Sequence, residues 1–98
     1  MAKRLTSVFT DDMDTCIFTG SPYVERHHIF GASNRHLSEH YGFVVPLRYD
    51  LHPNGARADK RYSKKVDSHL KKMAQEYFEA NYGSRDEFVK IFGRNYIE

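Results

Sequence analysis

The chain has 98 residues, of which 40% are hydrophobic and 29% are charged, so residues 1–98 are expected to form one small globular domain rather than a disordered tail. Its apolar runs are far shorter than the roughly 20 residues needed to span a bilayer, and no apolar stretch follows the basic N-terminus, so we expect neither a membrane segment nor a signal peptide. A single cysteine excludes an internal disulfide framework and favours a cytoplasmic location, whereas a net charge of +2 is too small to indicate nucleic-acid binding by itself.

The first half of the chain predicts two strands with a short helix between them. Residues 23–30 follow a turn at 20–22 and carry β-branched and aromatic residues at both ends, which favours a strand. Residues 35–41 are expected to form a short helix that ends at Gly42. Residues 43–47 predict the second strand, and Pro46 inside it predicts an edge strand or an early end.

The second half of the chain is predicted to be helical. From about residue 59, apolar side chains recur at spacings of three and four, which is typical of one face of a long helix, and Gly83 is expected to end it. Ser84 and Glu87 have the spacing of a capping box and predict the start of a short last helix. The order of strand, loop, strand, helix and helix predicts an α+β fold.

The histidines are the most informative residues for chemistry. His27, His28 and His52, three of six, lie in or beside the predicted strands and loops. Neighbouring side chains on a strand point to opposite faces, so one histidine of the pair can hold a metal ion while the other faces elsewhere. A neutral imidazole can take a proton from water near pH 7, and a divalent ion can stabilise charge on a phosphate. The alternative is that these are ordinary strand and turn histidines with satisfied hydrogen bonds.

Residues 25–31, together with 34–35, 38–39, 41–42, 44–47 and His52, resemble the small HNH-type proteins common in bacteriophage genomes. The resemblance extends from Cys16 to residue 96. It implies a ββα-metal (HNH/His-Me finger) core with a two-stranded antiparallel hairpin, a long helix and a short C-terminal helix. It also implies a phage-encoded, divalent-metal-dependent endonuclease that hydrolyses DNA phosphodiester bonds in the host cytoplasm.

The resemblance also implies roles for individual residues. His27 and His52 match metal ligands for Mg²⁺, Mn²⁺ or Zn²⁺, and His28 matches the general base. Asn34 and Asn54 both match the asparagine that braces the loop of the base, with Asn54 ranked lower because it sits in an Asn-Gly turn. Four arginines are expected to contact DNA phosphates: Arg26, Arg35, Arg48 and Arg57.

The chain also departs from this family. Many relatives hold a structural zinc ion with two cysteine pairs, but here only Cys16 remains, and Thr19, Arg48 and Leu51 stand at the other positions, so we expect no structural zinc. Arg57 or Arg61 occupies the region where a further histidine is common. These departures raise a second hypothesis, in which an inactive HNH scaffold binds nucleic acid or a host protein, for example as an inhibitor of a host defence enzyme.

Two further alternatives stay open at this point. The same site chemistry would serve RNA as well as DNA. The small size of the chain is also compatible with a homodimer that grips both strands of a duplex.

Overall fold

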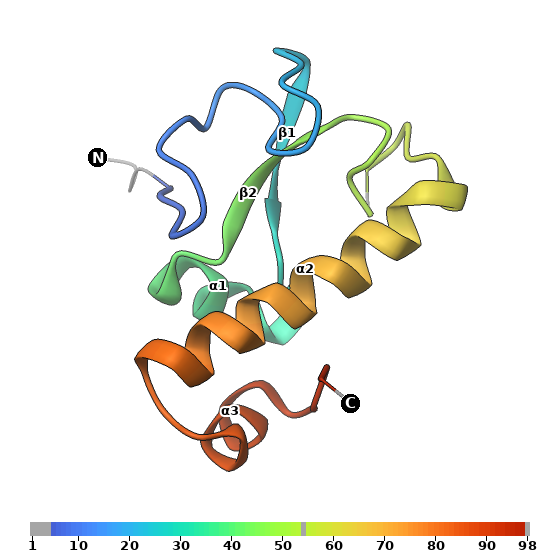
Figure 1. Ribbon diagram of the computed structural model, residues 1–98. Coiled ribbons are helices and arrows are strands. Elements are labelled where there is room, and N and C mark those ends of the chain that lie inside the picture. Colours follow the sequence, from blue (N-terminus) through green and yellow to red (C-terminus); the bar gives the residue numbers. More distant parts are fainter. Residues whose placement is uncertain (1–4, 54, 98) are drawn as a thin grey trace.

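Two strands and four helical segments make up the fold in the computed structural model, which describes residues 5–53 and 55–97. The elements are β1 (Val24–His28), a 3₁₀ turn η1 (Ala32–Asn34), α1 (Arg35–Tyr41), β2 (Val44–Arg48), α2 (Lys60–Asn81) and α3 (Arg85–Phe92). Their order is the predicted one, and the α+β class is confirmed. The long α2 runs obliquely across the two strands, and α3 folds back beside its C-terminal end (Figure 1).

The strands form an antiparallel pair in which Arg26 lies opposite Pro46 and His28 lies opposite Val44. Pro46 does not shorten β2, which continues to Arg48. Its carbonyl accepts a hydrogen bond from the Ile17 amide of the N-terminal segment at 3.0 Å, on the outer side of the pair. The amide that proline lacks would point to that same outer side, so no bond between the strands is lost. The expected edge position of Pro46 is therefore confirmed.

The helix ends lie where local signals predict them. Gly42 ends α1 in the left-handed region with φ 75°, and a Cβ there would meet Val8 at 3.0 Å. Asp59 caps α2 by accepting from the Arg61 amide at 3.0 Å. The capping box of Ser84 and Glu87 is present at the start of α3.

The core lies between the strand pair, α2 and α3, and it is rich in phenylalanine. Leu70, Ala74 and Phe78 of α2 are buried against Val45 and Leu47 of β2. Phe88 and Phe92 of α3 stack on each other with ring centres 4.4 Å apart. None of the helices in the described parts of the chain is long and apolar enough to cross a bilayer.

Candidate metal centre

One face of β1 gathers two histidines and a carboxylate. Glu25 and His27 are two residues apart, so they share a face, and their partners across the pair are Leu47 and Val45. Because both partners belong to the core beneath α2, this face of β1 is directed toward that core. His52, four residues beyond the end of β2, brings its ring centre within 5.0 Å of the His27 ring.

His27 is buried and neutral. Only 3% of it is exposed, and its Nε2 has no hydrogen-bond partner among the described residues. Burial, with smaller contributions from the nearby His52, Lys71 and His28, lowers the pKa of His27 from 6.5 to about 3. The imidazole is therefore neutral at physiological pH, which is the form that ligates metals.

His52 is held in one orientation by Glu25. Its Nδ1 lies 2.7 Å from Oε1 of Glu25, and since a carboxylate only accepts, Nδ1 carries the proton. The remaining Nε2 of His52 then keeps its lone pair. A metal-binding histidine is commonly held in this way by a carboxylate on its other nitrogen.

The pair fits part of a metal coordination sphere. An ion bonded at about 2.1 Å to one nitrogen of each ring, with near-tetrahedral angles, places the ring centres roughly 5 Å apart. Over residues 5–53 and 55–97, no three histidine, cysteine, aspartate or glutamate side chains gather as a complete cage. His27 and His52 would therefore contribute two ligands, and water or substrate oxygens would supply the others.

His28 belongs to a separate pair on the opposite face of β1. Its Nε2 lies 2.9 Å from Oε2 of Glu39 in α1, and Arg35 Nε is 3.8 Å from the same oxygen. With Nε2 donating to the carboxylate, Nδ1 is the nitrogen left to accept a proton. The structure thus brings His27 together with His52, and it places His28 with a carboxylate of its own.

Asn34 closes the 3₁₀ turn and binds the last helix. Its Nδ2 donates to the carbonyl of Phe92 at 3.0 Å, joining residues 58 positions apart. This bond fixes the end of α3 against the segment that follows β1. The second candidate, Asn54, lies outside the described residues.

The four arginines expected at phosphates each have a partner within the protein. Arg26 contacts Asp14 at 3.4 Å, and Arg35 is the residue beside Glu39 described above. Arg48 makes a two-pronged contact with Asp50 at 2.6 and 2.9 Å. Arg57 lies over the ring of Tyr49, 4.1 Å from its centre. Arg48 is the most firmly held, so it would have to exchange Asp50 for a phosphate, whereas Arg26 is half exposed.

The positions compared above with a structural zinc site make other contacts within the protein. Burial raises the pKa of the Cys16 thiol, but hydrogen bonds from the Thr19 side chain and the backbone of Arg48, Phe18 and Thr19 outweigh it, so the net pKa is lowered. Leu51 is buried in the core. Arg61 pairs with Asp59 at 2.9 Å at the start of α2.

Two carboxylates of the site did not emerge from the sequence. Glu25 could have been found, because it lies two positions before His27 on the same strand face. Glu39 has no such local signal, since it lies eleven residues from His28 and reaches it only through the packing of α1 on β1.

The chain matches no model of a protein family, no curated protein and no solved structure. What it does is therefore inferred from its own side chains.

Proposed function

We propose that this chain is an HNH-type, divalent-metal-dependent endonuclease of phage origin that hydrolyses phosphodiester bonds in DNA. The observation that carries the proposal is the buried Nε2 of His27, which lacks a partner among the described residues and lies against a second imidazole braced by Glu25. A buried imidazole nitrogen without a partner costs free energy, and a cation shared with the neighbouring His52 ring would supply that partner. The arrangement of two antiparallel strands under one long helix supports the ββα-metal interpretation.

In this proposal His27 and His52 hold the ion. The ion would stabilise negative charge on the phosphate and on the leaving oxygen. Imidazole ligands suit Zn²⁺ better than Mg²⁺, which prefers oxygen, so among Mg²⁺, Mn²⁺ and Zn²⁺ the site favours Zn²⁺. His28 would take the proton from the attacking water at Nδ1, while Glu39 orients the ring through Nε2.

A binding module without catalysis is the second candidate. The observation that favours it is the separation of His28 from His27, with the two side chains on opposite faces of β1. Such a scaffold would bind nucleic acid, or a host protein such as a defence enzyme, without hydrolysing anything.

Cleavage of supercoiled plasmid decides between the two candidates. Wild type, His27→Ala and His28→Ala are compared with Zn²⁺, Mn²⁺, Mg²⁺, Ni²⁺ or EDTA, and the exposed His36→Ala of α1 serves as the matched control. Removing a general base costs about 10²- to 10⁴-fold in rate, so His28→Ala should lose metal-dependent nicking. His27→Ala should lose it as well, because a metal ligand is removed, while His36→Ala should keep it. Undiminished cleavage by His28→Ala contradicts the mechanism. If folded protein cleaves neither DNA nor RNA with any of these ions, the binding module is the remaining candidate.

A further inference from the structure

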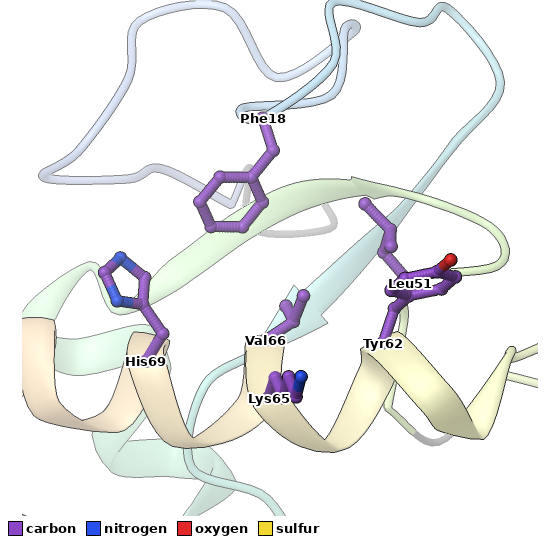
Figure 2. Close-up of a pocket in the computed structure, with 6 residues that line it drawn as sticks. All are labelled: Phe18, Leu51, Tyr62, Lys65, Val66 and His69. Atoms are coloured by element: carbon purple, nitrogen blue, oxygen red, sulfur yellow. The ribbon is translucent and has the colours of Figure 1, made fainter.

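An apolar groove lies on the side of α2 that faces the N-terminal segment. Its volume is about 260 Å³, and its lining is Phe18, Leu51, Tyr62, Lys65, Val66 and His69. Phe18 reaches down from the turn after Cys16 toward α2, and Tyr62, Val66 and His69 rise from successive turns of that helix (Figure 2). The groove is separate from the His27 and His52 pair, whose residues do not line it.

The groove presents aromatic rings to the solvent. Phe18 is 45% exposed and Tyr62 is 52% exposed, although both side chains are large and hydrophobic. The ring of Phe18 lies 6.0 Å from that of His69, and Leu51 and Val66 line the groove between the ends. Exposed rings above an aliphatic floor form a surface on which another flat ring can stack.

Positive charge borders the same groove. Lys65 lies at its rim, and it makes no ion pair with any described residue. Lys72 lies seven positions after it on the same flank of α2, next to the aromatic stripe. Arg61, four positions before it, also lies on this flank, but its charge is paired with Asp59. A ligand that matches this surface needs a flat apolar ring and, beside it, a negative charge.

We propose that this groove binds an unpaired base of a single-stranded nucleic acid, which stacks on Phe18 and Tyr62 while Lys65 contacts the neighbouring phosphate. The charge of the rim favours this occupant over an acyl chain or a neutral peptide. A paired base cannot enter, because its faces are covered by its neighbours in the duplex. The site goes beyond the proposed nuclease centre, since it needs neither the metal ion nor His28.

The test is fluorescence anisotropy in EDTA, where no metal-dependent cleavage occurs. The probes are a labelled oligothymidylate of about 12 nucleotides, within the site size of single-strand binding folds, the same backbone with abasic sites in place of bases, the matching duplex, and an oligouridylate. We expect the oligothymidylate to bind at least about fivefold more tightly than the abasic strand, the low end of one stacking contact. The oligouridylate arm shows whether DNA or RNA is preferred.

Variants assign the binding to the groove. Phe18→Leu and Tyr62→Leu keep an apolar side chain but remove the ring, and each should weaken oligothymidylate binding about fivefold or more while leaving the abasic strand unchanged. Tyr82→Leu is the matched control, because Tyr82 is also 52% exposed but lies at the far end of α2, about 30 Å along the helix axis. Lys65→Gln should lower the dependence of affinity on salt by about one phosphate contact.

Three results would overturn the proposal. The first is equal affinity for the thymidylate and abasic strands. The second is unchanged binding in both Phe18→Leu and Tyr62→Leu. If one of these variants does not fold, unchanged binding in the other is enough. The third is self-association in sedimentation that disappears in these variants, which would make a second copy of the chain the occupant. If the plasmid is not cleaved but base-dependent binding is intact, the proposed nuclease function is contradicted and the proposed base-binding groove is retained.

Discussion

At the scale of single residues, the burial of His27 lowers the stability of the fold, because no described residue forms a hydrogen bond with its Nε2. A buried acceptor without a partner costs about 1–3 kcal/mol, and the Nε2 of His27 has none among the described residues. An apolar residue of similar size would fill the same position without that cost. The metal ion proposed above would supply the partner that this nitrogen lacks.

The burial of His27 predicts a pH dependence of stability. Its pKa is about 3 in the folded protein and 6.5 as a free side chain, so between these values the unfolded chain binds a proton that the folded chain does not. The free energy of unfolding is therefore unaffected by His27 well above pH 6.5, and it decreases as the pH falls below that value. At pH 5 the loss relative to pH 7 should be about 2 kcal/mol. Urea unfolding in EDTA at the two pH values measures it.

His27→Leu isolates this contribution. The groups whose charges act on His27, namely His52, Lys71 and His28, and the Glu25 that holds His52, are still present in the variant. The decrease in unfolding free energy between pH 7 and pH 5 should be about 2 kcal/mol smaller in His27→Leu than in wild type. Parallel pH curves for the two proteins would show that His27 is not buried as a neutral ring.

Glu25 predicts a second effect, on metal affinity. Glu25→Gln keeps the size of the side chain but removes the charge that holds His52 at 2.7 Å. Loss of such a brace typically weakens metal binding about 10- to 100-fold, which calorimetric titration with Zn²⁺ measures. Glu39→Gln is the matched control, because it makes the same change beside His28 on the other face of β1. Equal weakening by both variants would contradict a centre at His27 and His52.

At the scale of elements, local signals were sufficient for the sequence to predict where helices begin and end. Gly42 and the capping box of Ser84 and Glu87 act within four residues of chain, so their effect does not depend on the rest of the fold. The hydrogen-bond partners of the site residues could not be predicted from such local signals. The bonds of His28 to Glu39 and of Asn34 to Phe92 span 11 and 58 residues, and they exist only after the elements have packed.

The capping box at α3 makes this locality measurable. Ser84 accepts from the Glu87 amide at 3.1 Å, and its own amide donates to the Glu87 side chain at 3.0 Å. Ser84→Ala removes the first bond and should lower the free energy of unfolding by about 1 kcal/mol. Ser68→Ala, in an exposed interior position of α2, is the control and should cause no loss, because alanine favours a helix interior. A larger loss from Ser68→Ala would show that helix propensity does not explain the stability of these elements.

At the scale of the whole molecule, one buried side chain joins α2 to the segment after α3. Gln75 is fully buried, and its Nε2 donates to Oδ1 of Asn95 and to Oε2 of Glu79, both at 2.8 Å. Its Oε1 accepts from the Tyr96 amide at 2.7 Å. The ring of Tyr96 packs on the ring of Phe30, which follows β1, and the two ring centres are 5.6 Å apart. Gln75 thus connects the end of the chain to the core beneath the strand that carries the histidines.

Replacing Gln75 should release this end of the chain and lower overall stability. Gln75→Leu fills the same volume but leaves the Tyr96 amide without its partner, whereas Asn95 Oδ1 still accepts from the Ile97 amide, so we expect a loss of roughly 1–3 kcal/mol. For a chain of this length each kcal/mol lowers Tm by about 4–8 °C. Hydrogen exchange should show lost protection at the Tyr96 amide. Asn95→Ala removes one of these bonds and keeps the one to Tyr96, so it should cost less and leave that amide protected. An equally protected Tyr96 amide in Gln75→Leu would mean that the aromatic packing alone holds the segment.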